Sequence, residues 1–227
     1  MAAAASLREP VSLLATRFAD ARPGLRVETS FGASSELAAQ LRAGAPVDVV
    51  LCADEEIPRA LEAEGLATSL RPFASNRLVV LASPEVVAQV RQPGDLAGPA
   101  VKRIALPAPA VPAGHYAREW LARHGLAEAV GARAVQTENV RAALAAVDDG
   151  HADAAIVYAT DARVAHSAKL AFEIPDAEQP RIVYVGLVAR DSHQRESARD
   201  FLDFLVGPAG VGVLREAGFA ALPGSAP

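Results

Sequence analysis

The sequence has little cysteine, few aromatic residues and no long apolar run. It contains one cysteine, Cys52, in 227 residues, which excludes an internal disulfide and a cysteine-rich metal site. Cys52 ends the buried-strand pattern VDVVLC, so we expect it to pack in the core rather than to act as a nucleophile. No run of about 18 consecutive apolar residues occurs, and we therefore expect no transmembrane helix.

Aromatic residues make up only 5% of the chain, although 51% of its residues are hydrophobic. The core must therefore be built mainly from alanine, valine and leucine. A chain of this length fits one large domain or two small ones. It can bury about 70% or more of its unfolded surface, so we expect a substantial core.

The chain also lacks an excess of positive charge, because it carries 22 Lys and Arg against 27 Asp and Glu. Charges of both signs are spread along it, and the formal net charge is −5. This balance argues against non-specific nucleic-acid binding and against a polybasic membrane patch. It does not exclude a small anion, since a few local hydrogen-bond donors can hold one within an acidic protein.

Strand-like and helix-like patterns alternate along the chain. We expect strands at residues 25–30, 47–52, 76–83, 102–107, 132–136, 153–158 and 181–190. We expect helices at residues 7–20, 35–44, 53–65, 114–125 and 140–150, and two more that close the chain. This rhythm predicts an α/β fold with largely parallel sheets covered by helices on both faces.

At four places, small or polar residues lie between a strand-like run and a helix. Helix starts present backbone N–H groups with partial positive charge, and in open α/β sheets they gather at the carboxyl ends of the strands. Several starts that converge would form a neutral cage for an anion. Ordinary helix capping is the alternative, since Ser6 with Glu9 fits a capping box and the serines before Glu36 fit N-caps. The junction residues are Ser6, Ser34 with Ser35, Ala113 with Gly114, and Asn139 with Val140.

Seven segments together resemble the molybdate-binding proteins of ABC-type uptake systems, which have the type II periplasmic solute-binding fold. They are AAASL, SFGASSELAAQLRAGAPVDVVLCAD, NRLVVLAS, VPAGHYARE, ENVRAALAAV, AAIVYATDA and GPAGVGVLREAGF. The segments occur in family order and run from Ala2 to Phe219. The resemblance implies two α/β lobes with a ligand cleft between them, lobe 1 formed by residues 1–78 and 188–227 and lobe 2 by residues 79–187.

The resemblance also implies that a tetrahedral oxyanion, molybdate or tungstate, is held by hydrogen bonds alone. Ser6 and Ser34 would donate from their hydroxyl and backbone N–H groups. Ala113 and Val140 would each donate a backbone N–H, and Tyr158 would donate its hydroxyl. The resemblance implies no cation, no cofactor, no direct metal ligand from the protein and no catalysis.

As the solute-binding component of an ABC transporter, the protein would be a periplasmic monomer that passes its ligand to a membrane permease. Its lobes would close about a hinge near residues 77–82 and 184–190. MAAAASL lacks a basic start and a long apolar run, so we expect it not to be a signal peptide. Members of the family have an export signal and then a strand that leads into AAASL, so we expect a misassigned start codon, a trimmed form or a variant.

Three other functions stay open. A protein of the same fold could bind sulfate, phosphate or a small organic acid, with Arg141 as a cation for a carboxylate, although a salt bridge or exposure to solvent is the plainer expectation for that residue. An enzyme would need acid–base groups, but no metal-spaced histidine cluster, phosphate-binding loop or nucleophile elbow is present. The sensor domain of a regulator would need an attached DNA-binding segment, and the sequence has none. The acid–base candidates are Asp54, Glu55, His115 and Tyr158.

Overall fold

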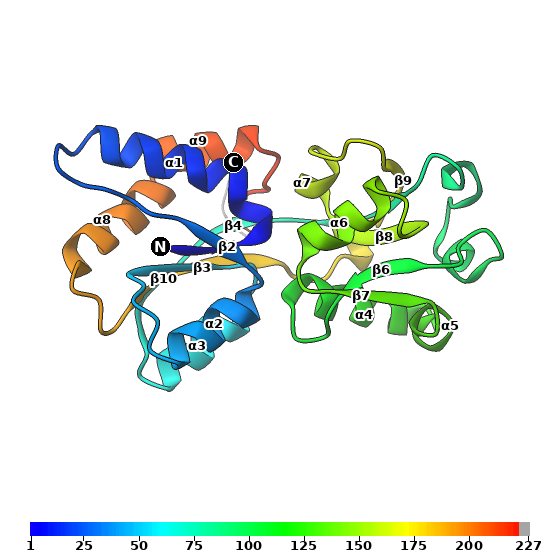
Figure 1. The fold of residues 1–227 in the computed structure, drawn as a ribbon, viewed down its shortest axis with the longest axis horizontal. Coiled ribbons are helices and arrows are strands. Elements are labelled where there is room, and N and C mark those ends of the chain that lie inside the picture. Colours follow the sequence, from blue (N-terminus) through cyan, green and yellow to red (C-terminus); the bar gives the residue numbers. More distant parts are fainter. Residues whose placement is uncertain (223–227) are drawn as a thin grey trace. The chain divides into compact units, whose positions relative to one another are not determined.

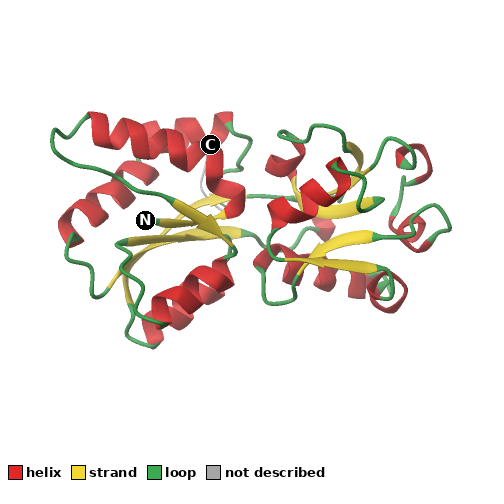
Figure 2. Ribbon diagram, in the orientation of Figure 1, coloured by secondary structure: helices red, strands yellow, loops and turns green. Residues whose placement is uncertain are grey.

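The computed structural model describes residues 1–222, and the chain divides into two units that each contain one sheet (Figure 1). Among the described residues, unit 1 comprises residues 1–75 and 182–222, and unit 2 comprises Asn76–Arg181. The chain therefore crosses between the units twice. Helices lie on both sides of each sheet, as Figure 2 shows, so the expected α/β fold is confirmed.

The sheet of unit 1 has the strand order β2-β1-β3-β10-β4. Strand β1 lies between β2 and β3 and pairs with both in parallel. Strand β10 pairs antiparallel with β3 and with β4, so within the described residues it is the one strand that runs against the other four. The strands are β1 (Ala2–Ala4), β2 (Ser30–Gly32), β3 (Val49–Cys52), β4 (Ala67–Ser75) and β10 (Val183–Ala189).

Helices cover both faces of this sheet. In Figure 1, α1, α8 and α9 lie on one side of it and α2 and α3 lie on the other. Helix α2 ends at Arg42, and Gly44 follows with a φ of 80°, a left-handed conformation typical of glycine after a helix. The helical elements of unit 1 are η1 (Ala5–Leu7), α1 (Arg8–Asp20), α2 (Ser34–Arg42), α3 (Glu56–Ala63), α8 (Arg195–Val206) and α9 (Pro208–Glu216).

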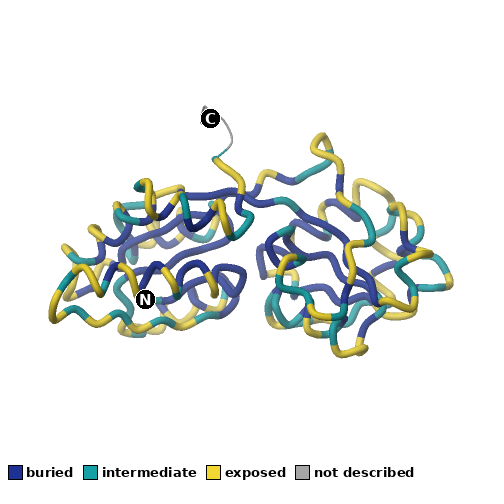
Figure 3. The backbone as a smooth tube through the Cα atoms, turned by 90° about the horizontal axis from the view of Figure 1, so that it is seen from above, coloured by how far each residue is buried: buried dark blue, intermediate teal, exposed yellow. Residues whose placement is uncertain are grey.

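The core of unit 1 forms where these helices meet the strands, and Figure 3 shows the sheet segments as largely buried. Cys52 is fully buried in one such cluster, together with Leu37, Leu61 and Leu187. Burial raises the pKa of its thiol well above the ordinary value. The structure thus places Cys52 in the packing role that the sequence predicts.

The sheet of unit 2 has the strand order β7-β6-β8-β5-β9. As in unit 1, the fourth strand in this order runs against the other four. Strands β6, β7 and β8 are parallel, whereas β5 is antiparallel to both of its neighbours. Helices α4 and α6 each contact β6 and β8 and lie on opposite sides of the sheet (Figure 1). The strands are β5 (Leu78–Ala82), β6 (Ile104–Pro107), β7 (Ala134–Thr137), β8 (Ala154–Tyr158) and β9 (Lys169–Glu173), and the α-helices are α4 (Pro112–Arg123), α5 (Ala127–Gly131), α6 (Val140–Asp148) and α7 (Ala159–Ala162).

The crossings between the units lie elsewhere than the sequence suggests. The expected limits were 78/79 and 187/188, whereas the structure divides the chain at 75/76 and 181/182. The reason is strand pairing, because all of β10 pairs with strands of unit 1 and all of β5 pairs with strands of unit 2. The segments 77–82 and 184–190, expected to form a hinge, thus contain sheet strands. Residues 223–227, which were assigned to lobe 1, lie outside the described residues.

The expected strand at residues 25–30 forms over Ser30–Gly32 only. Its ladder with β1 begins at the pair Ala2 and Ser30, and residues 25–29 precede that pair. From the sequence we predict no strand over the residues of β4, which include Pro72. A proline is tolerated there because β4 is at the edge of the sheet. Among residues 1–222, none of the helices is both long and apolar enough to span a bilayer.

Asp148 ties the end of α6 to the loop before β9. Its carboxylate accepts the N–H of Ser167 and of Ala168 at 2.8 Å each, and the N–H of His166 at 3.2 Å. Partial burial opposes ionisation, but the hydrogen bonds outweigh it and hold the pKa of Asp148 below its ordinary value. The charged carboxylate therefore stabilises the folded state at neutral pH.

We predict that Asp148→Asn lowers the free energy of unfolding at pH 7 by about 1 kcal/mol, the scale of a partly exposed charged hydrogen bond. Because the pKa is depressed by folding, the stabilisation is present above the unfolded-state pKa of about 4 and is lost as pH falls through the folded-state value. Urea unfolding at pH 7, 5 and 3 should therefore show wild type and variant converging in acid. The exposed Asp149→Asn is the control, and a constant difference at all three pH values would contradict the prediction.

Candidate functional site

Ser6 and Ser34 occupy equivalent positions beyond two neighbouring strands of unit 1. Ala4 at the end of β1 pairs in parallel with Gly32 at the end of β2. Ser6 and Ser34 each follow that pair by two residues, Ser6 in η1 and Ser34 as the first residue of α2. Both serines therefore lie at the carboxyl edge of the sheet, where the sequence predicts them.

The hydroxyl of Ser34 is held by the neighbouring strand. Its Oγ accepts the N–H of Ala53, the residue after β3, at 3.0 Å. Ser34 is buried, whereas Ser35 is only partly buried. The N-cap of α2 is Ala33, so Ser34 is not the ordinary N-cap that was the alternative interpretation. The oxygen of Ser34 accepts this bond, so its own hydroxyl proton can be donated to another acceptor, either the neighbouring Cys52 sulfur or a ligand.

The hydroxyl of Ser6 contacts a side chain that the sequence analysis missed. Its Oγ lies 3.0 Å from the Oη of Tyr184 on β10, and both groups are buried. The ring of Tyr184 packs edge-on against Phe73 and Phe219, with ring centroids 6.0 and 5.2 Å away. The N-cap of α1 is Leu7, so Ser6 does not cap that helix as the alternative interpretation required. The sequence gives one signal for this role of Tyr184, which is the presence of a tyrosine within an apolar run.

In unit 2, three predicted residues gather at the carboxyl edge of the three parallel strands. Pro107 at the end of β6 pairs with Thr137 at the end of β7, and Ala105 pairs with Ala155 of β8. The three predicted residues follow or end these strands: Ala113 follows β6, Val140 follows β7 and Tyr158 ends β8. The structure thus brings the predicted residues of this unit to one edge of its sheet.

The start of α4 presents the N–H of Ala113. Pro112 is the first residue of the helix and has no N–H, and the N-cap Val111 makes no capping bond through its side chain. Gly114 holds this turn against the sheet, because a Cβ there would lie only 2.3 Å from the carbonyl oxygen of Ala108 and 2.4 Å from that of Pro107. The absence of a side chain therefore lets the helix start approach the end of β6 closely.

The start of α6 is capped by Asn139. The Oδ1 of Asn139 accepts the N–H of Arg141 and of Ala142, both at 3.0 Å. The N–H of Val140 is not one of the two that this cap uses. The cap therefore fixes the first turn without consuming the donor that the sequence assigns to a ligand.

Tyr158 and Arg141 meet at a residue that the sequence analysis also missed. The N–H of Tyr158 donates to the carboxylate of Asp161 at 3.1 Å, and the Nε of Arg141 lies 2.8 Å from the other carboxylate oxygen. Arg141 thus forms the salt bridge that was its plainer expectation. Asp161 lies three residues after Tyr158, which is the spacing at which a carboxylate in the first turn of a helix bonds the N–H of the N-cap residue. This spacing is the one sequence signal that could have indicated Asp161.

The acid–base candidates have contacts typical of helix starts and surfaces. Asp54 accepts the N–H of Ile57 at 2.7 Å, Glu55 pairs with Arg59 at 3.0 Å, and His115 is exposed on α4. Across residues 1–222, no group of three or more His, Cys, Asp or Glu side chains is placed to hold a metal ion.

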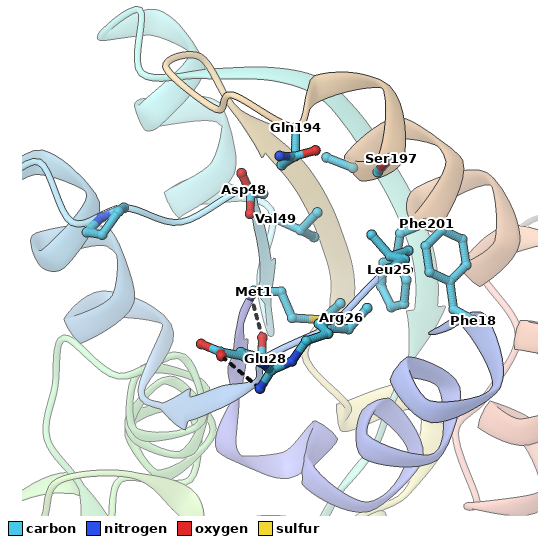
Figure 4. Close-up of a pocket in the computed structure, with 13 residues that line it drawn as sticks. Met1, Phe18, Leu25, Arg26, Glu28, Asp48, Val49, Gln194, Ser197 and Phe201 are labelled. Atoms are coloured by element: carbon cyan, nitrogen blue, oxygen red, sulfur yellow. Dashed lines mark hydrogen bonds and ion pairs between the residues drawn. The ribbon is translucent and has the colours of Figure 1, made fainter. Parts of the chain in front are cut away.

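A separate pocket of about 300 Å³ lies at the opposite edge of the unit 1 sheet (Figure 4). Apolar rings of Phe18 and Phe201 line one part of it, and the carboxylates of Glu28 and Asp48 line another. The amino group of Met1 donates to the carbonyl oxygen of Glu28 at 2.7 Å. Met1, Glu28 and Asp48 precede β1, β2 and β3, whereas the two phenylalanines lie in α1 and α8. None of the five predicted contact residues lines the pocket. Its charged groups are of both signs, since Arg26 and the Met1 amino group lie beside the two carboxylates.

Comparisons with known proteins cover nearly the whole chain. The family of bacterial extracellular solute-binding proteins matches residues 1–220. The molybdate-binding protein ModA of Escherichia coli (strain K12) is 31% identical over 227 residues, which cover 96% of this chain and 86% of that protein. ModA of Haemophilus influenzae is 32% identical over 228 residues, with 96% and 88% covered.

A solved structure agrees with the sequence comparisons. The periplasmic molybdate-binding protein of Azotobacter vinelandii superposes with a TM-score of 0.85 at 27% identity, and 98% of each chain is covered. The shared feature is the fold of two sheets flanked by helices. The family match to residues 1–220 includes every element that carries a predicted contact residue. The chain therefore belongs to the bacterial extracellular solute-binding proteins and, among them, to the ModA molybdate-binding family.

Proposed function

We propose that this protein is the solute-binding component of an ABC transporter and that its solute is molybdate. The observation that carries the proposal is the placement of uncharged donors at the carboxyl edge of each sheet, in a chain related to ModA over nearly its full length. The related proteins are solute-binding proteins, which supports binding without catalysis. A periplasmic location, a membrane permease as partner and a monomeric state are part of the same proposal.

Hydrogen bonds alone can hold a doubly charged oxyanion. Taking the dianion from water without new bonds would be prohibitive, so each of its oxygens needs a donor. Each hydrogen bond to a charged acceptor contributes about 1.5–3 kcal/mol, and several together offset the loss of hydration. The structure supports two hydroxyl donors in unit 1, because Ser34 is oriented by Ala53 and Ser6 by Tyr184.

We propose that one oxyanion takes donors from both units. Ser6 and Ser34 of unit 1 would supply hydroxyl and N–H groups, and unit 2 would supply the N–H groups of Ala113 and Val140 and the hydroxyl of Tyr158. The bound ion would stabilise the conformation in which both sets of donors contact it. The segments that would bend are the two crossings at 75/76 and 181/182.

Ligand size sets the expected selectivity. Molybdate and tungstate are nearly equal in size, so fixed donors should bind both. Sulfate is smaller, and some donors would then be too distant to bond. A site for sulfate, phosphate or an organic acid is the second candidate. Arg141, the cation that an organic carboxylate would use, is instead paired with Asp161 at 2.8 Å, which argues against an organic acid.

We predict that molybdate and tungstate stabilise the protein and that sulfate and phosphate do not. A ligand at about 100 times its dissociation constant adds about 2.7 kcal/mol, which raises the melting temperature by roughly 5–10 °C. Differential scanning fluorimetry with each oxyanion at equal concentration and ionic strength measures this. A shift with sulfate or phosphate alone would favour the second candidate, and no shift with any of the four would contradict both.

We predict that Ser34→Ala and Tyr158→Phe each weaken molybdate binding by about 10- to 100-fold, since each removes one hydroxyl donor to a charged acceptor. Isothermal titration calorimetry measures the dissociation constants. Ser35→Ala is the matched control, because Ser35 is the adjacent serine and is only partly buried. Wild-type affinity in both variants would show that molybdate binds elsewhere.

A further inference from the structure

Asp161 is a fully buried carboxylate in unit 2 that connects two of the proposed ligand contacts. One of its oxygens accepts the N–H of Tyr158 at 3.1 Å, and the other lies 2.8 Å from the Nε of Arg141. Arg141 directly follows Val140, whose N–H is a proposed donor. One side chain thus joins the start of α6 to the end of β8.

A buried ion pair at this place is costly to build. Desolvation of two charges can exceed their attraction, so such a pair adds little stability over apolar residues of the same size. The contribution of this ion pair must then be the relative position that it imposes on the groups it contacts. The carboxylate contacts both the guanidinium of Arg141 and the N–H of Tyr158, so it restrains the first turn of α6, which begins at Val140, relative to the end of β8.

The ion pair also determines the charge that an anion would meet. Arg141 is the cation next to a proposed donor, and it is largely buried. An unpaired guanidinium would attract any anion, whatever its size. Pairing with Asp161 cancels that charge, so discrimination depends on the distances to neutral donors.

We propose that Asp161, acting through Arg141, is a positioning residue that sets the spacing of the Val140 N–H and the Tyr158 hydroxyl and thereby the preference for molybdate over the smaller sulfate. The proposal rests on the proposed function. It assigns Asp161 no direct contact with the ligand. A residue that only stabilised the fold would affect the melting temperature and leave the preference between two ligands unchanged.

The test compares the ratio of the sulfate and molybdate dissociation constants in the full-length protein and its variants. Asp161→Asn keeps an acceptor for the Tyr158 N–H but removes the charge that pairs with Arg141. We expect the ratio to fall at least 10-fold and sulfate binding to become more dependent on ionic strength, because the guanidinium is then uncompensated. An unchanged ratio in folded Asp161→Asn would overturn the proposal.

A second variant removes the risk that a lone buried charge prevents folding. Arg141→Met combined with Asp161→Asn removes both charges of this pair and the contact that they form between α6 and the end of β8. We expect it to fold and to show the lowered ratio without the added salt dependence. A wild-type ratio in this double variant would also overturn the proposal.

The control is Glu119→Gln, which removes the half-exposed pair of Glu119 with Arg123 on α4 and should leave the ratio unchanged. The wild-type titration separates the two hypotheses. If wild type binds no molybdate, the proposed function fails. If wild type prefers molybdate and the variants keep that preference, only the positioning role fails.

Discussion

Parallel pairing of neighbouring strands is the constraint on which both sets of donors depend. In unit 1 the pair Ala4 and Gly32 places Ser6 and Ser34 side by side in register, and in unit 2 the pair Pro107 and Thr137 does the same for the loops that start α4 and α6. A slip of one residue would turn each following side chain to the other face of the sheet. The buried apolar strands prevent that slip, so the core that stabilises each unit also aligns its donors.

A binding protein that uses neutral donors depends on geometry rather than on charge for its selectivity. Charge would bring all dianions to the protein alike, because long-range attraction does not measure ionic radius. Here the net charge is −5 and the cation beside the donors, Arg141, is paired with Asp161. Hydrogen bonds are sensitive to distance over tenths of an ångström, which makes them suited to separating ions of equal charge.

The sequence predicted the features that local patterns determine. The alternation of strands and helices, the burial of Cys52 and the junction residues at the helix starts agree with the structure, because each depends on a few neighbouring residues. The sequence could not predict where the chain crosses between the units, because the pairing of β10 with β3 and β4 joins segments more than a hundred residues apart. Tyr184 was missed for the same reason, since its partner Ser6 is 178 residues away, whereas Asp161 lies three residues after Tyr158 and had only that local spacing as a signal. The spacing of the donors around a ligand stays a prediction.

Donors bind tightly only when they are oriented before the ligand arrives, and this explains the residues around them. A serine hydroxyl rotates freely, so the bond from Ala53 to Ser34 and the contact of Tyr184 with Ser6 reduce the entropy that binding would otherwise cost. The backbone donors are held in another way, by the close approach of the α4 start at Gly114 and by the Asn139 cap of α6. Substitutions that leave every proposed contact in place can therefore still weaken binding by releasing the groups that orient them.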